Sequence, residues 1–422
     1  MSNYKELKIL DFYYEKGREE LIFNIKSLLY KKYPSLFEKL NFDNDNIFLE
    51  PLLFGFFTRN HQKVTIEQIL FGYIKDEIKP NIITVHADEE GTIYLPNYGY
   101  FVTNQREQLS LKLVWDIKKG ISLVSPYDNK EIYYLFKTLQ FLEEAPNIEL
   151  CLISNPIYNE VLYSWFQTEI RNIKKGGRIS NYREKYEKEY LFIQNLKKDT
   201  LAIKDKLELA FSLIKKHNPL EYSKYQSAVK RIVCFNNPFM RGFVTKDLHG
   251  TVFLSVDEQC NETFFIDELV HQCSHNVFNT ITSNIKDYLK IDKDTPLKQL
   301  TREKHNNERR GFYDAYHGLY TVSTGVRVLT NIYKNQSFDI LKKHEFIGRL
   351  SIKKRRFRTG IQEIDFETIF TDDGQRIYNI LDSTCNQIIE NNPEIFNIDY
   401  DFSNQPPVYS DVKFKELNPL LE

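Results

Sequence analysis

The sequence predicts an α+β protein, with a mixed N-terminal region that contains short antiparallel strands and a mainly helical C-terminal half. Between residues 82 and 115, short β-branched or aromatic runs alternate with Gly, Pro, Asn and acidic residues, a pattern typical of a small antiparallel sheet. After residue 260, apolar residues recur at helical spacing in several long segments. The chain has 422 residues, enough for two or three domains with a substantial core.

We expect three parts along the chain. Residues 1–172 form the mixed α/β region, and peptide recognition is a candidate role for it because an open sheet edge can pair with an extended peptide. Residues 173–200 are charged and contain the pair Gly176 and Gly177, which predicts a hinge or linker. Residues 201–422 form a mainly helical domain that carries the candidate metal-binding and catalytic residues.

The elements of the first part follow from hydrophobic spacing and turn residues. Residues 1–40 have a helical period that Pro34 interrupts, and residues 65–76 predict a second helix that ends before Pro80. A further helix is expected at residues 131–144. The expected strands are residues 82–86, 92–95, 99–103, 111–115 and 150–154.

In the last part, two more expected strands are followed mainly by helices. The strands are residues 229–235 and 251–256, the second introduced by His249 and Gly250. The expected helices are a surface helix that continues to residue 214 and the segments 264–283, 311–333, 349–358 and 375–391.

The composition excludes some partners and compartments. Lys and Arg total 57 and Asp and Glu total 58, so the net charge gives no support for binding to nucleic acid or to an anionic membrane. The five cysteines are odd in number and show no CxxC spacing, which favours a reducing compartment. The N-terminus lacks the apolar core of a signal peptide, and no apolar run is long enough to span a bilayer. We therefore expect a soluble, cytoplasmic protein.

The strongest candidate site is a pair of histidines in the apolar segment 264–283. His271 and His275 stand four residues apart, so on a helix they lie on one face, one turn apart, as in many metal sites. Gln272 stands where HExxH proteases carry the glutamate that activates water, and an amide cannot take that proton. Peptide hydrolysis by this machinery is therefore disfavoured, although Gln272 can still hydrogen-bond groups near the metal.

A third histidine, His317, lies in a later expected helix that also carries the small residues Ala315, Gly318 and Gly325. Small residues let another helix approach closely, so His317 could complete a three-ligand site. Imidazole suits Fe, Zn, Cu and Ni, and ligand type alone does not choose the metal. The alternative is that the histidines are buried and hydrogen-bonded without a metal.

Each of the two histidine segments also carries a carboxylate on the same helical face. Glu268 precedes His271 by three residues, and Asp314 precedes His317 by three residues. Such a carboxylate can complete a 2-His-1-carboxylate iron site, or it can orient the imidazoles. Two such motifs on facing helices are also typical of di-iron bundles, but the sequence offers no further pair of inward-facing glutamates.

With these residues in view, the sequence resembles the HExxH-motif family of peptide-modifying enzymes associated with ribosomally made, post-translationally modified peptides. The resemblance runs from about residue 207 to residue 381, and this chain has HQxxH in place of HExxH. It follows an order of features, namely residues 250–255, residues 268–275, the arginine pair before His317-Gly318, and Thr371 to Gly374. Members studied as peptide β-hydroxylases use iron and 2-oxoglutarate. The resemblance implies that His271, His275 and His317 are the metal positions.

A 2-oxoglutarate enzyme needs a cation for the distal carboxylate of this co-substrate, and the guanidinium group suits it best. Arg309, Arg310 and Arg327 are the nearest candidates in sequence, and Arg309 and Arg310 are equally well explained as surface residues at a helix start. Residues 352–358 form the densest basic run, and an acidic leader peptide is a plausible partner for it.

The function expected from the sequence is an Fe(II)- and 2-oxoglutarate-dependent oxygenase that hydroxylates a side chain of a ribosomally made precursor peptide. Two alternatives stay open. One is a zinc-dependent hydrolase or peptidase-like enzyme, which would need a base other than Gln272. The other is a catalytically altered, peptide-binding maturation protein, which would need no metal.

Overall fold

The computed structural model describes most of the chain, and the α+β fold class is confirmed. Its contacts divide the chain into a helical unit (Met1–Glu20, Asp205–Ala228 and Gln259–Glu422) and a mixed unit (Leu21–Lys204 and Val229–Glu258). The described residues are 2–59, 64–104, 109–151, 157–158, 160–162, 164–165, 200–236, 242–257, 260–300, 310–358, 364–403 and 409–420.

Each unit combines segments that are distant in sequence, whereas the expected division was contiguous. The strand segment after residue 229 belongs with the N-terminal strands, because β9 (Arg231–Phe235) pairs in parallel with β8 (Glu149–Cys151). The expected linker lies outside the described residues up to residue 199, so that boundary stays a prediction.

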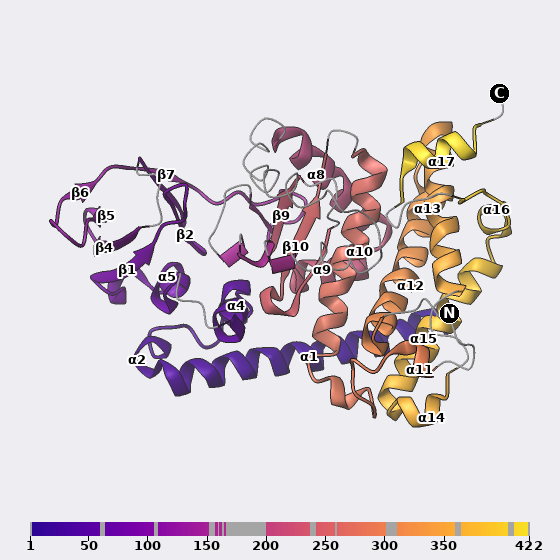
Figure 1. Ribbon diagram of the computed structural model, residues 1–422, viewed down its shortest axis with the longest axis horizontal. Helices are drawn as coiled ribbons and strands as arrows, with labels where there is room; N and C mark the ends of the chain where they lie inside the picture. Colours follow the sequence, from indigo (N-terminus) through magenta and orange to yellow (C-terminus); the bar gives the residue numbers. More distant parts are fainter. Residues whose placement is uncertain are drawn as a thin grey trace, which may run out of the picture. The chain divides into compact units, whose positions relative to one another are not determined.

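The helical unit is built around α12 (Phe312–Asn335), which packs against α10 (Glu262–Ile281), α13 (Ile340–Arg358) and α15 (Asp372–Glu390), as Figure 1 shows. The predicted helices for these segments are confirmed. The N-cap residue Asn261 starts α10 by accepting a hydrogen bond from the backbone N–H of Phe264. The other helices of this unit are residues 2–20 of α1 (Ser2–Lys32), residues 205–217 of α8 (Thr200–His217), α9 (Pro219–Ala228), the short turn η5 (Ile285–Asp287), α11 (Leu297–Leu300), α14 (Phe366–Ile369), α16 (Pro393–Phe396) and α17 (Asp411–Leu417).

The mixed unit contains two antiparallel sheets, with strand orders β1-β4-β5-β6 and β2-β3-β7, and a parallel sheet with the order β10-β9-β8. The expected strands of this region are confirmed over the described residues, which exclude residues 152–154 of the expected strand 150–154, and β5, β6 and β7 are additional strands. The bounds are β1 (Ile82–His86), β2 (Thr92–Leu95), β3 (Gly99–Thr103), β4 (Ser110–Asp116), β5 (Gly120–Val124), β6 (Glu131–Ile132), β7 (Tyr134–Lys137) and β10 (Thr251–Ser255). Its helical segments are the rest of α1 and of α8, α2 (Pro34–Phe37), α3 (Asp45–Phe48), α4 (Pro51–Arg59), α5 (Ile66–Leu70), η1 (Phe71–Tyr73), η2 (Asp76–Ile78) and η4 (Lys246–Leu248).

Two helix predictions in this unit need correction. The helix expected at residues 131–144 is wrong, because β6 and β7 occupy its first half. The apolar residues there form a continuous run from Ile132 to Phe136, and their aromatic and β-branched composition favours a strand. The helix expected at residues 65–76 is shorter, since α5 gives way to a 3-10 turn at Phe71.

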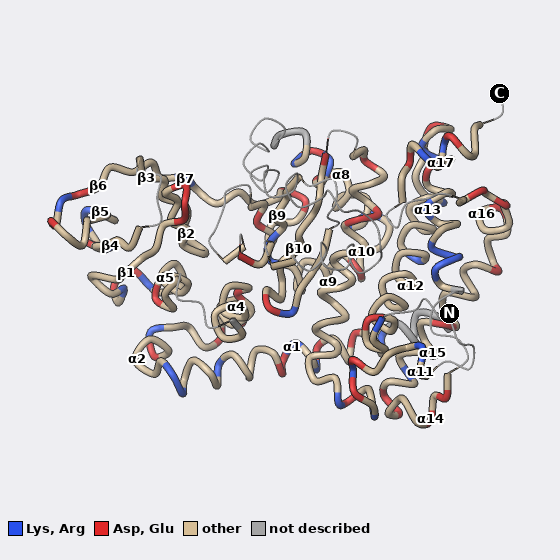
Figure 2. Tube along the Cα trace, viewed as in Figure 1, with Lys and Arg blue, Asp and Glu red and all other residues tan. Residues whose placement is uncertain are grey.

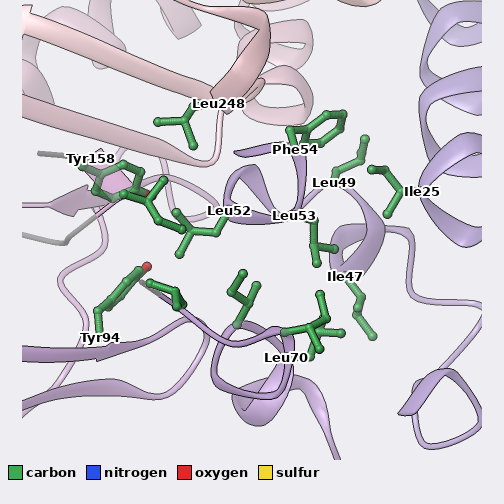
Figure 3. Packing of buried hydrophobic residues seen from close by; sticks show 14 of the residues in the cluster. Ile25, Ile47, Leu49, Leu52, Leu53, Phe54, Leu70, Tyr94, Tyr158 and Leu248 are labelled. Carbon is green, nitrogen blue, oxygen red and sulfur yellow. The ribbon is translucent and has the colours of Figure 1, made fainter. Parts of the chain in front are cut away.

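The core of the mixed unit is aliphatic and aromatic, and Figure 3 shows part of it. Beside this core lies a buried cluster of three charged side chains, Arg231, Glu50 and Glu149. The guanidinium of Arg231 donates to both carboxylate oxygens of Glu50, at 2.5 and 2.8 Å, and to Glu149 at 3.1 Å. All three side chains are at most 4 % exposed, so the opposite charges satisfy one another inside the fold. The labelled core residues are Ile25, Ile47, Leu49, Leu52, Leu53, Phe54, Leu70, Tyr94, Tyr158 and Leu248.

Candidate metal centre

The candidate residues of α10 lie on the only part of that helix that is not buried. Of its 20 residues, the five that keep appreciable exposure are Glu262, Phe264, Glu268, His271 and His275. The last three recur at spacings of three and four residues, which places them on one stripe of the helix. The predicted histidine face therefore exists, and it is accessible from outside the helix.

The structure brings the three predicted histidines together. The Nε2 atoms of His271 and His275 are 3.2 Å apart, and Nδ1 of His275 is 3.0 Å from Nε2 of His317. The same Nε2 of His317 is 3.2 Å from the backbone carbonyl oxygen of His275. His275 is thus the central ring of a chain of three imidazoles contributed by α10 and α12.

One metal cannot bind all three rings of this chain, and of its two pairs His271 and His275 are the ones that share a helix stripe with Glu268. Two nitrogens bound to one metal at about 2.0–2.1 Å each lie about 3 Å apart, close to the observed separation of the His271 and His275 Nε2 atoms. His317 instead approaches the other nitrogen of His275, and one ion cannot bind both nitrogens of a ring. Over the part of the chain that the structure describes, no group of three or more His, Cys, Asp or Glu side chains forms a ready metal site.

The arrangement therefore favours His271 and His275 as a ligand pair and His317 as a partner that orients His275. A metal-bound histidine commonly donates the N–H of its second nitrogen to a neighbouring acceptor, which fixes its tautomer. Nε2 of His317 accepts that hydrogen bond from Nδ1 of His275 only when it carries no proton; in the opposite tautomers it donates to Nδ1 and to the carbonyl oxygen of His275. The rings of Phe278 and Tyr313 lie nearly parallel to the ring of His317, at 5.3 and 5.5 Å between centroids, and hold its orientation.

Both ligand candidates are neutral near pH 7. Burial lowers the pKa of His271 to about 3, and the charge of Lys353 acts in the same direction. Burial also lowers the pKa of His275 well below its ordinary value, assisted by His317 and His271. Neutral imidazoles keep a lone pair for a metal or for a hydrogen-bond donor.

Gln272 and Glu268 interact directly on the same helix. The side-chain amide of Gln272 donates to Oε1 of Glu268 at 2.7 Å. Burial raises the pKa of Glu268, and the hydrogen bond from Gln272 opposes that rise. Gln272 itself is 2 % exposed, and its carbonyl oxygen has no hydrogen-bond partner among the described residues. The residue that replaces the protease glutamate thus holds the carboxylate one turn earlier.

Asp314 does not join this group. It is exposed in the first turn of α12, and it accepts a hydrogen bond from the backbone N–H of Gly311. Burial raises its pKa, and the charge of Asp294 adds to the rise. This carboxylate is therefore engaged at the start of the helix, as acidic residues at that position commonly are.

The three candidate arginines have different surroundings. Arg309 lies outside the described residues. Arg310 is exposed, and one of its terminal nitrogens would lie 3.9 Å from a Cβ atom placed on Gly318, the neighbour of His317. Arg327 is 2.7 Å from Glu221 of α9, a carboxylate that is only 2 % exposed. Of the described pair, Arg310 lies beside the turn of α12 that carries His317, and Arg327 is held in an ion pair.

The sequence did not predict a cluster of charged side chains next to the site, which is formed by Asp267, Arg349 and Lys353. Asp267 is bound by Lys353 at 2.6 Å and by Arg349 at 3.2 Å, both from α13. Burial would raise the pKa of Asp267, but the charges of Lys353 and Arg349 outweigh it and lower that pKa to about 2. The charge of Arg356 also reaches His271. The basic run 352–358 was visible in the sequence, but its approach to α10 depends on tertiary packing.

Comparison with known proteins adds no assignment, since no protein-family model matches the chain and no curated protein matches it significantly.

Two further observations concern the described residues away from the site. Among the described residues, no helix has the length and apolar character needed to cross a membrane. A cavity of about 440 Å³ lies against α15 and Ile9, and its lining includes none of the site residues.

Proposed function

We propose that this chain is an Fe(II)- and 2-oxoglutarate-dependent oxygenase that hydroxylates a side chain of a ribosomally made precursor peptide. The observation that carries the proposal is the 3.2 Å approach of the His271 and His275 Nε2 atoms on the one open stripe of α10. Glu268 lies on the same stripe, which supports a site of two histidines and one carboxylate. The resemblance to the HExxH-motif peptide-modifying family supplies the choice of iron and co-substrate.

In this proposal each residue has a separate role. His271 and His275 bind iron through Nε2, and Glu268 is the third protein ligand, held by the amide of Gln272. With Nε2 of His317 unprotonated, His317 would accept the N–H of His275 Nδ1 and leave the lone pair of His275 Nε2 for the metal. When bound, the iron and 2-oxoglutarate supply the oxidising chemistry that places one oxygen atom from O₂ into a C–H bond.

The co-substrate and the peptide are both expected to meet positive charge. Arg310 is the proposed partner of the distal carboxylate of 2-oxoglutarate, because its fork of N–H groups can bind both oxygens. Arg355 and Arg356 are exposed on α13, where Figure 2 shows a run of basic residues. An acidic leader peptide would be attracted to that run.

Gln272 separates this proposal from a zinc hydrolase. A hydrolase of the HExxH type needs an ionisable group at position 272 to take a proton from water, and the amide there donates to Glu268 instead. A metal-free, peptide-binding protein is the second candidate. It is favoured by the fact that the three imidazoles can hydrogen-bond to one another in the same chain without any metal.

The test of the reaction uses the full chain, Fe(II), 2-oxoglutarate and a short peptide encoded beside its gene. The proposal predicts a gain of one oxygen atom on the peptide and release of succinate, both lost in His271→Ala. His217→Ala is the matched control, because His217 lies at the end of α8 outside the imidazole chain. Peptide cleavage without 2-oxoglutarate would favour the hydrolase. An unchanged peptide that still binds would favour the metal-free protein.

A further inference from the structure

The mixed unit contains an aromatic cage around the ammonium group of Lys79, formed by the rings of Phe71, Tyr98 and Trp115. The Nζ atom lies 5.3 Å from the centroid of the Phe71 ring, 5.4 Å from that of Tyr98 and 5.0 Å from that of Trp115. The rings of Tyr98 and Trp115 both stand nearly perpendicular to the ring of Phe71, at interplanar angles of 72° and 80°. Such a set of rings attracts a cation through its electron-rich faces.

The three rings are held in place by the surrounding fold. Phe71 begins η1 and is fully buried in a core cluster with residues of β1, β4 and β5. Trp115 lies in β4, and Tyr98 lies in the turn between β2 and β3, where its ring stacks on that of Phe101. Both side chains pack against the same core cluster. The cage is therefore preorganised for a cation.

The rings replace most of the hydration of the Lys79 ammonium group. This side chain is only 4 % exposed, and it forms an ion pair with Asp76, whose side chain is 57 % exposed. Among the described residues, Asp76 is the one hydrogen-bond acceptor of this ammonium group. Because an ammonium group has three N–H donors, the other two are compensated by the rings.

The segment that carries Lys79 is itself exposed. Residues 75–78, which include the turn η2, are all exposed, and Lys79 is the only buried residue between Ile74 and Ile83. Withdrawal of Lys79 would break one ion pair to an exposed carboxylate, which is a weak contact, and would expose no other side chain of its segment. Lys79 is therefore held mainly by the rings, and another cation can compete for them.

We propose that the aromatic cage binds a methylated or quaternary ammonium group of a ligand, and that Lys79 occupies the cage as an internal competitor. A quaternary ammonium group suits the cage better than lysine does, because it is more weakly hydrated and has no N–H donor that needs an acceptor. The carboxylate of Asp76 adds a negative charge beside the cage. Small quaternary ammonium compounds and methylated lysine side chains of peptides both carry this group. The proposal is independent of the metal centre.

The test is a titration of the full chain with tetramethylammonium, followed by tryptophan fluorescence. Trp115 and Trp165 are the two tryptophans of the chain, so Trp165→Phe provides the background in which Trp115 reports binding. We expect saturable binding to this chain, and about tenfold tighter binding after Lys79→Ala, because the competitor is removed. When Tyr98→Leu is added to Lys79→Ala, binding should weaken about tenfold or more, because one ring is lost.

The controls separate recognition of the cation from effects on folding or shape. Tyr127→Leu is the matched control for Tyr98→Leu, because Tyr127 is 90 % exposed and lies outside the cage, and it should leave binding unchanged. Tert-butanol, a neutral molecule of similar shape, should not bind. Circular dichroism verifies that every variant is folded. Choline and a trimethyllysine peptide distinguish the two sources of the ligand, since tighter binding of the peptide assigns the cage to peptides and tighter binding of choline assigns it to small molecules.

The proposal is overturned by a chain with Lys79 intact that shows no saturable binding, because Lys79 is then a permanent structural part of the cage. It is also overturned if Lys79→Ala binds tetramethylammonium no more tightly, or if Tyr98→Leu binds as well as its control. Binding of tert-butanol as tight as that of tetramethylammonium would show an apolar cavity in place of a cation site, and would overturn it as well.

Discussion

The ion cluster around Arg231 and the imidazole chain on α10 place polar groups inside the protein in two different ways. Arg231 makes three hydrogen bonds to two buried carboxylates of opposite charge, and all three side chains are almost fully inaccessible. The imidazoles contact one another between α10 and α12, and the two on α10, His271 and His275, lie on a partly exposed stripe of that helix. Close beside them, the carbonyl oxygen of Gln272 is buried without a partner among the described residues.

This difference is the one expected between a structural cluster and the binding site that we propose. In the Arg231 cluster the charges are matched within the fold, so its removal should cost stability. On α10, the proposed role of the histidines is to bind a metal, so removal of a histidine should cost binding and little stability. The predictions below test this contrast, in order of decreasing effect on stability.

The largest effect is expected for Arg231→Met. The substitution leaves Glu50 and Glu149 buried without their cation, which costs about 3–5 kcal/mol of unfolding free energy. Denaturant unfolding measures it, with Lys118→Met as an exposed control that should change stability by less than about 0.5 kcal/mol. A loss of under about 1 kcal/mol in Arg231→Met would mean that the cluster has no structural role.

Glu221 is a buried carboxylate of the helical unit that also depends on cationic partners. We expect its contribution to the unfolding free energy to change with pH. Burial would raise the pKa of Glu221, but the charges of Lys224 and Arg327 outweigh it and lower that pKa from 4.5 to about 2. Because the pKa is lower in the folded state, the stabilisation is complete above about pH 4.5 and is lost as the pH falls towards 2. It amounts to on the order of 3 kcal/mol.

The measurement is unfolding free energy against pH for the wild-type chain and for Glu221→Gln. The difference between the two should shrink between pH 4.5 and pH 2. A difference that stays constant over this range would show that the ion pair does not hold the pKa of Glu221 low.

The smallest effect on stability is expected for His271→Ala. The side chain is neutral and partly exposed, and its loss removes one ring contact with His275, so the cost is about 1 kcal/mol or less. The same unfolding experiment measures it without added metal. A cost similar to that of Arg231→Met would show that His271 has a structural role, and it would contradict the proposed difference between the two regions.

The sequence predicted the parts of the site that depend on local geometry. The four-residue spacing of His271 and His275 was enough to place both on one face of α10, and an apolar helix was visible around them. His317 was found from the small residues near it, but the nitrogen that it approaches depends on ring orientation. That orientation is set by Phe278, whose packing depends on tertiary contacts.

The remaining predictions were limited by contacts between residues that are far apart in the sequence. Arg327 was a candidate for the co-substrate until its ion pair with Glu221, 106 positions earlier in the chain, was seen. Asp314 has the right spacing from His317 but is engaged at the start of α12. In the fold, the helix predicted at residues 131–144 is wrong, because a short continuous apolar run such as residues 132–136 does not by itself distinguish a strand from a helix.

Metal content tests the central claim most directly. The full chain is loaded with Fe(II) without oxygen, freed of excess metal, and analysed for iron per chain, beside His271→Ala and His217→Ala. The proposed centre predicts one equivalent of iron in the wild-type chain and in His217→Ala, and none in His271→Ala. Equal iron content in all three proteins, or none in the wild-type chain, would contradict it.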